Sequence, residues 1–137
     1  MPKRYPPDDP REWLSRARSN LAQAKVKQRG VYFEDLCFNA QQAAEKAIKA
    51  LLIRRDVKFP YVHDIAELLT SLENAGQEIP ETIKQAEELT RYAVFTRYPI
   101  APRMKPKEYR EAVKMAEAVV GRAEKLLARS RERKKKP

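Results

Sequence analysis

The last part of the chain carries an apolar repeat with the period of an α-helix. A spacing of three and four residues places the repeated side chains on one helix face, which must be buried against other segments. The repeat comprises Tyr109, Ala112, Val113, Ala116, Val119, Val120, Ala123, Leu126 and Leu127. Only three glycines occur among 137 residues, so few positions interrupt long helices. The sequence therefore predicts an all-α protein.

Similar apolar spacing and helix-boundary residues predict four further helices. Asp9-Pro10 is a typical helix start, and Gly30 and Gly76 are candidate helix ends. The five predicted helices cover about residues 10–29, 32–55 and 63–75, a fourth stretch that begins at residue 80, and residues 106–130. The prolines of residues 96–106 predict a connection after the fourth helix. Mostly short connections favour an antiparallel, up-and-down bundle of about five helices in one domain. The alanine-rich second helix predicts a close approach to a neighbouring helix or to a second subunit.

The net charge of +10 is concentrated near the C-terminus. Residues 1–102 carry 16 Lys and Arg against 14 Asp and Glu, a net charge of +2, whereas residues 103–137 carry 13 against 5, a net charge of +8. A terminal basic run can remain a solvated extension, or it can attract the phosphates of RNA or DNA. We predict a helical bundle over residues 1–128 and a basic, disordered tail over residues 129–137.

Several protein classes are excluded by what the sequence lacks. No apolar run approaches the roughly 18–20 residues that span a membrane, and Met1–Pro10 has no signal-peptide core, so we expect a cytoplasmic protein without a membrane partner. Cys37 is the only cysteine, which excludes an internal disulfide and a cysteine-based zinc site, and we predict that it lies in the core. One histidine and three glycines supply neither a metal-ligand set nor a glycine-rich phosphate loop. We therefore expect no metal and no cofactor.

Four stretches occur together in the order and spacing of one known family. They are Trp13-Leu14 with Ala17 and Leu21, the segment Cys37–Leu51, His63-Asp64 before an apolar helix, and Arg97-Tyr98-Pro99 after a helix. In the second stretch, the residues that match the pattern F-x-x-Q-Q-A-x-E-K-x-x-K-A in register are Phe38, Gln41-Gln42, Ala43, Glu45-Lys46 and Lys49-Ala50. Over about residues 10–125 the chain resembles the prokaryotic HEPN domain, whose name abbreviates higher eukaryotes and prokaryotes nucleotide-binding.

The resemblance has consequences for fold and partners. It implies an up-and-down helical bundle that is commonly a homodimer and has a polar groove associated with nucleotides or RNA. Members are often encoded as partners of small nucleotidyltransferases in two-component, toxin–antitoxin systems. The resemblance therefore suggests a second copy of the chain, a nucleotidyltransferase subunit and a nucleotide as partners.

The family's ribonuclease motif is incomplete in this chain. That branch uses R-x(4-6)-H, in which arginine stabilises phosphate charge and histidine transfers protons. The corresponding segment begins at Arg91 and reads R-Y-A-V-F-T-R, with Arg97 where the histidine would be expected. An arginine keeps its proton at accessible pH, so it can bind phosphate but cannot act as a base. We assign no catalytic residue and expect no ribonuclease activity by the family mechanism.

Three residues near the end of the fourth predicted helix are candidates for nucleotide binding. The guanidinium groups of Arg91 and Arg97 can form paired hydrogen bonds with phosphate, and Tyr98 can stack or form a hydrogen bond. The structural alternative is that the arginines form salt bridges and that Tyr98 closes the bundle where the chain turns.

Further candidates lie on the second helix and before the third. The residues predicted to form the polar side of the second helix are Gln41, Gln42, Glu45, Lys46 and Lys49. Glu45 and Lys49 have the spacing of an i,i+4 ion pair, which stabilises a helix by about a few tenths of a kcal/mol. The paired glutamines would suit a dimer groove that binds a polar ligand. His63 and Asp64 either cap the third helix or contact the nucleotide.

Several functions are therefore open. The leading hypothesis is a non-catalytic, homodimeric protein that binds a nucleotide through Arg91, Arg97 and Tyr98, with help from the second helix. A complementary hypothesis makes the chain the partner subunit of a nucleotidyltransferase. The alternatives are a ribonuclease toxin with a non-standard site and an RNA- or DNA-binding module that uses the last helix and the basic tail.

Overall fold

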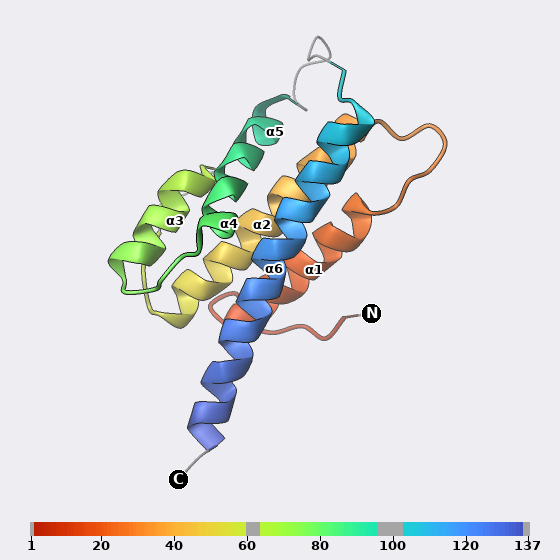
Figure 1. The fold of residues 1–137 in the computed structure, drawn as a ribbon. Coiled ribbons are helices and arrows are strands. Elements are labelled where there is room, and N and C mark those ends of the chain that lie inside the picture. Colours follow the sequence, from red (N-terminus) through yellow and green to blue (C-terminus); the bar gives the residue numbers. More distant parts are fainter. Residues whose placement is uncertain (1, 60–63, 96–102, 136–137) are drawn as a thin grey trace.

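One long helix, α2, forms the centre of the bundle, and the other helices pack around it (Figure 1). The computed structural model describes residues 2–59, 64–95 and 103–135, with the side chains of residues 2–59, 64–93 and 103–129. The elements in chain order are α1 (Pro10–Ala24), α2 (Phe33–Arg54), α3 (Ile65–Asn74), α4 (Glu81–Lys84), the 3-10 helix η1 (Gln85–Leu89), α5 (Thr90–Phe95) and α6 (Pro106–Lys135). No strand occurs in these described ranges. The predicted all-α fold is confirmed.

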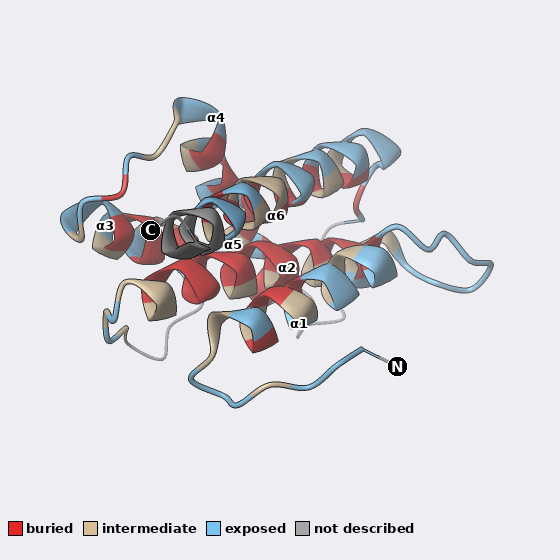
Figure 2. Cartoon of the chain, turned by 90° about the horizontal axis from the view of Figure 1, so that it is seen from below, coloured by how far each residue is buried: buried red, intermediate tan, exposed pale blue. Residues whose placement is uncertain are grey.

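The composition of α2 explains its central position. Its small, buried side chains let α1 and α6 pack closely against it. These alanines, all 0% exposed, are Ala40, Ala43, Ala44, Ala47 and Ala50. Larger side chains such as Ile48, Leu52 and Leu68 fill the spaces between the helices. Figure 2 shows the buried residues along the inner helix faces and the exposed residues on the outer faces of α1 and α6.

The first helix ends earlier than the predicted limit of residue 29. It begins as predicted, because the carboxylate of Asp9 caps it by accepting a backbone N–H bond of 2.9 Å. At its other end, the Tyr109 hydroxyl donates a hydrogen bond of 2.7 Å to the carbonyl oxygen of Ala24. The last carbonyls of a helix lack partners within it, so this contact with α6 stabilises the early end. Residues 25–32 then form an exposed loop.

Two predicted helix-end glycines adopt left-handed backbone conformations. Gly76, with φ of +95°, follows the end of α3, and its N–H donates a hydrogen bond of 2.9 Å to the carbonyl of Glu73. Gly30, with φ of +89°, lies within the loop after α1 rather than at the helix end. The prediction for Gly76 is confirmed. The prediction that Gly30 ends the first helix is wrong, because α1 already ends at Ala24.

The fourth predicted helix is interrupted. Instead of one continuous helix from residue 80, the chain forms α4, a 3-10 segment (η1) and α5. The hydroxyl of Thr90, at the start of α5, accepts a hydrogen bond of 2.9 Å from the N–H of Ile65 at the start of α3. The chain changes from 3-10 to α-helix at Thr90, the residue that accepts this hydrogen bond. Local apolar spacing does not reveal a bond between such distant residues. The inward positions predicted for α4 and η1 are nevertheless buried: Ile83, Ala86 and Leu89.

The last helix is longer than predicted. α6 starts at Pro106, as expected, but continues to Lys135 rather than ending near residue 130. No glycine or proline lies between Gly121 and Pro137, and basic side chains near a helix C-terminus are favourable because of the helix dipole. The division into a bundle and a disordered tail over residues 129–137 stays a prediction.

Candidate functional site

A row of polar side chains runs along α2 inside the core. Gln41, Glu45 and Lys49 are spaced by four residues and are 0%, 2% and 6% exposed. Lys49 Nζ lies 3.3 Å from Glu45 Oε2, and Gln41 Nε2 donates to Glu45 Oε1 at 3.3 Å. Gln42 joins the row by donating from Nε2 to Gln41 Oε1 at 2.7 Å. The structure therefore brings four predicted site residues into one hydrogen-bonded network.

The residues of this network, which were predicted to form the polar side of α2, are buried, except Gln42, which is half-buried. The ammonium group of Lys49 lies 5.7 Å and 5.5 Å from the ring centroids of Trp13 and Phe59. Aromatic rings attract a cation, so these rings and the carboxylate of Glu45 offset the lost hydration of Lys49. The predicted i,i+4 ion pair is confirmed, but it is a buried pair that joins core elements.

Lys46 belongs to a second network, between α1 and α2. Its Nζ donates to Asn20 Oδ1 at 2.7 Å, and Asn20 Nδ2 donates to Asn39 Oδ1 at 3.1 Å. Burial lowers the pKa of Lys46, while the nearby Glu45 carboxylate opposes that shift. The two asparagines were not predicted as site residues. Asn39 lies within the motif on α2, but no local spacing pairs it with Asn20 on another helix.

Arg91 lies on α5, which packs against α2. Its Nη2 donates a hydrogen bond of 2.9 Å to the Tyr92 hydroxyl, and its guanidinium carbon is 4.9 Å from the Tyr92 ring centroid. That hydrogen bond raises the pKa of Arg91, and burial raises the pKa of Tyr92, which is only 1% exposed. Arg91 itself is exposed and forms no ion pair with any carboxylate in the described ranges. It therefore presents a positioned cation to solvent.

Arg91 lies near the N-terminal end of the polar row of α2. Cys37 precedes Gln41 by four residues and so occupies the first position of the same row. The Cys37 thiol is close enough to Arg91 and Tyr92 for electrostatic interaction with each of them. The row therefore runs from the α5 side, at Cys37, to the aromatic rings around Lys49.

Cys37 is expected to be unreactive in the folded protein. It is 0% exposed, as predicted for a core residue, and burial raises the pKa of its thiol from 9.0 to about 12. Since the thiolate is the reactive form, DTNB at pH 8 should modify the native protein more than about 100-fold more slowly than the urea-unfolded protein. Equal rates would contradict the buried position.

The same thiol predicts a loss of stability at alkaline pH. The unfolded chain releases the Cys37 proton near its ordinary pKa, whereas the folded chain retains it, so stability falls as pH rises from about 9 to about 12. This contribution should be missing in Cys37→Ala, which serves as the control in urea unfolding at each pH.

The other predicted site residues fall into two groups. Asp64 caps α3, because its Oδ1 accepts backbone N–H bonds of 3.0 Å and 3.4 Å from the first turn. This capping role was predicted and explains the residue without a ligand. His63, Arg97 and Tyr98 lie outside the described residues, so their roles stay predictions.

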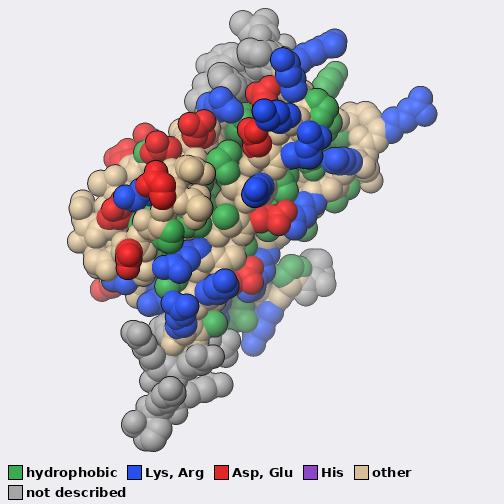
Figure 3. Space-filling model, viewed as in Figure 1, with side chains coloured by type: hydrophobic (Ala, Val, Ile, Leu, Met, Phe, Trp, Pro, Cys, Tyr) green, Lys and Arg blue, Asp and Glu red, His purple; other side chains and the backbone are tan. Residues whose placement is uncertain are grey.

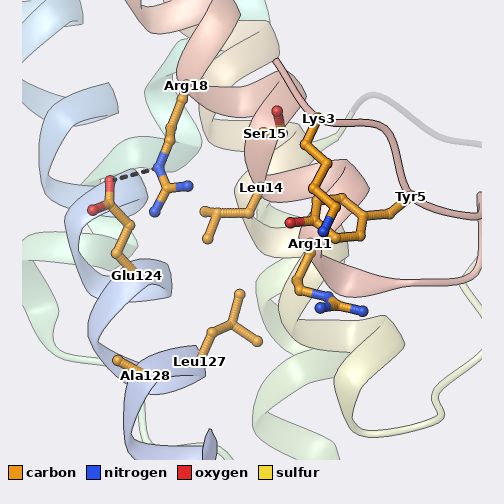
Figure 4. Close-up of a pocket in the computed structure, with 9 residues that line it drawn as sticks. All are labelled: Lys3, Tyr5, Arg11, Leu14, Ser15, Arg18, Glu124, Leu127 and Ala128. Carbon is orange, nitrogen blue, oxygen red and sulfur yellow. Dashed lines mark ion pairs between the residues drawn. The ribbon is translucent and has the colours of Figure 1, made fainter.

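A cavity of about 490 Å³ lies between the N-terminal segment, α1 and α6 (Figure 4). Leu14 and Leu127 point toward each other across it, and none of the predicted site residues that the structure describes lines it. Arg18 pairs with Glu124 at 3.5 Å, and Arg11 pairs with the capping carboxylate of α1 at 2.7 Å. Since both arginines already have carboxylate partners, this cavity is a weaker candidate for anion binding than the surface at Arg91.

Two kinds of feature are missing from the described ranges. Within them, no group of three His, Cys, Asp or Glu side chains is arranged to hold a metal ion. In the same part of the chain, no helix has both the length and the apolar content needed to cross a membrane.

Comparisons with known proteins give one family and two solved structures. The model of the HEPN domain matches residues 10–126. The chain is similar to TT1696 from Thermus thermophilus, with 33% identity and a TM-score of 0.73 over 85% of this chain and 96% of the other. It is also similar to ST0689, an archaeal HEPN homologue, with 25% identity and a TM-score of 0.68 over 86% of this chain and 97% of the other. No curated protein matches.

Proposed function

The chain belongs to the HEPN domain family, and from this premise we propose that it is a non-catalytic, nucleotide-binding member. The proposed binding surface, here the Arg91 face, is the surface around the exposed guanidinium of Arg91 on α5. The buried Tyr92 holds this group from beneath, near the buried Cys37 of α2. One observation carries the proposal: the exposed guanidinium of Arg91 is held in place by the buried Tyr92 and pairs with no carboxylate in the described ranges.

The chemistry of Arg91 supports a phosphate as the group that is bound. A guanidinium offers several N–H donors in one plane, which match the oxygens of a phosphate, and it remains charged at any accessible pH. The hydrogen bond to Tyr92 restricts the side chain before a ligand arrives, which lowers the entropy lost on binding. Arg97 and Tyr98 are proposed to add contacts. With arginine at the expected histidine position, the nucleotide is bound without proton transfer.

The proposal extends to the assembly. We propose that the working unit is a homodimer and that the nucleotide reaches the Arg91 face either free or on a nucleotidyltransferase partner. The family membership supports both statements, and the exposure of Arg91 is compatible with a ligand carried by another protein. Sedimentation equilibrium tests the dimer, and a monomer mass at all concentrations would count against it.

Replacing Arg91 should weaken nucleotide binding. Isothermal titration of ATP and GTP into wild type and Arg91→Ala is expected to show about 10-fold to 100-fold weaker binding in the variant, because a charged hydrogen bond to phosphate is lost. The matched control is Arg129→Ala, which removes an exposed arginine from the C-terminal part of α6. This variant should bind the nucleotides as wild type does. Absence of binding by wild type, or equal losses in both variants, would refute the role of the Arg91 face.

A further inference from the structure

The loop between α1 and α2 exposes hydrophobic side chains to solvent. Among the described residues, the exposed large hydrophobic side chains are Val26 at 49%, Val31 at 41% and Tyr32 at 72%. All three fall within residues 25–32, although the rest of the described chain buries or half-buries its large apolar groups. Such a concentration of exposed apolar groups in one segment is typical of a contact surface.

The first turn of α2, which follows this loop, packs against the start of α6 and the segment before it. The ring of Tyr109 stacks on Phe33, with centroids 5.0 Å apart. The carboxylate of Glu34 accepts a hydrogen bond of 2.7 Å from the backbone N–H of Met104. These contacts join two segments into one surface, which we call the basic loop surface and define as residues 25–33 and 103–107.

The residues of the basic loop surface are rich in cations and include no Asp or Glu, although the carboxylate of Glu34 lies between its two segments. Its six cationic residues, all exposed, are Lys25, Lys27, Arg29, Arg103, Lys105 and Lys107. The nearest carboxylates in the sequence are Glu34, Asp35 and Glu108. One cation is paired, since Lys25 lies 3.4 Å from Glu117. Figure 3 shows Lys and Arg side chains over the start of α6, with a few Asp and Glu side chains among them, and further Asp and Glu side chains near α3 and α4.

We propose that the basic loop surface binds a single-stranded nucleic acid, with its cations against the phosphates and Tyr32 stacked on a base. Proteins that bind single strands combine a positively charged track with exposed aromatic rings, because every base offers a flat face. Phosphates and bases are common to RNA and DNA, and the test below separates the two. The proposal goes beyond nucleotide binding at the Arg91 face and uses other residues.

Two other occupants fit the observations less well. A second copy would place one basic loop surface against another, and the like charges would repel. A membrane surface is disfavoured because the exposed apolar groups are two valines and one tyrosine on a loop, without the apolar face of an amphipathic helix. The nucleic acid uses both the charge and the exposed ring.

The test is fluorescence anisotropy with labelled ten-nucleotide oligo-U and oligo-dT at low and moderate salt. Wild type should bind one or both strands, and affinity should fall steeply with salt as counterions are released. The double variant Lys27→Glu/Arg29→Glu should lose at least about 10-fold in affinity and show a shallower salt dependence. Tyr32→Ala should lose about 5-fold to 100-fold, while Tyr32→Phe, which keeps the ring, should bind nearly as wild type does.

The controls separate this proposal from the others. Lys125→Glu/Arg129→Glu makes the same charge change near the other end of α6 and should reduce affinity less. Arg91→Ala should leave oligonucleotide binding unchanged, so either function can fail alone. Thermal unfolding by circular dichroism verifies that each variant is folded. The proposal is overturned if wild type binds neither strand, if only the control double variant loses binding, or if vesicles with anionic lipid bind while both oligonucleotides do not.

Discussion

Replacing Glu45 with leucine is expected to lower the free energy of unfolding by about 3–5 kcal/mol. The substitution removes the carboxylate from a row in which Lys49 is 6% exposed and lies 3.3 Å from Glu45. Lys49 would then remain buried without its opposite charge, and the hydrogen bond from Gln41 Nε2 to Glu45 Oε1 would be lost. Urea unfolding followed by circular dichroism measures the change.

A double variant distinguishes the buried charge from simple loss of packing. Glu45→Leu/Lys49→Met removes both charges and fills similar volume, so it should recover most of the stability lost in Glu45→Leu. If the double variant were as unstable as the single one, the interpretation of the pair as a compensated buried charge would be wrong.

Tyr109→Ala should destabilise the protein by about 3–5 kcal/mol, because a large buried side chain is removed from the junction of three elements. Tyr109 is 4% exposed, its ring stacks on Phe33 at the start of α2, and its hydroxyl donates to Ala24 at the end of α1. The variant should also loosen the 25–32 loop, which hydrogen exchange of its amides would detect.

The conservative variant divides this effect into two parts. Tyr109→Phe keeps the ring stack and loses only the hydrogen bond to Ala24, so a loss of about 1–3 kcal/mol is expected from the unsatisfied buried carbonyl. A change below about 1 kcal/mol for Tyr109→Ala in urea unfolding would show that the junction does not stabilise the bundle as described.

Local sequence patterns predicted the fold where the cause is local. Apolar spacing located α2 and the start of α6, and Asp9 and Asp64 marked helix starts through their own capping bonds. The errors arise where a distant residue decides the outcome. The Tyr109 hydroxyl helps to set the end of α1, and a bond between Thr90 and Ile65 accompanies the break in the fourth predicted helix. Neither bond leaves a periodic signal.

The candidate site was predicted only in part for the same reason. The motif on α2 identified the members of the polar row, and spacing predicted the ion pair of Glu45 and Lys49. Their burial depends on the rings of Trp13 and Phe59, which come from other segments. The supporting role of Tyr92 for Arg91 also depends on how α5 packs, although the two residues are neighbours in sequence.

The central claim is that a nucleotide binds at the Arg91 face, and NMR of ¹⁵N-labelled protein during titration with ATP tests it most directly. We expect saturable shifts of the Arg91 side-chain Nε–Hε signal and of backbone amides in α5 and the first turns of α2. Shifts confined to the cavity between α1 and α6 or to the basic loop surface, or no shifts at all, would contradict the claim.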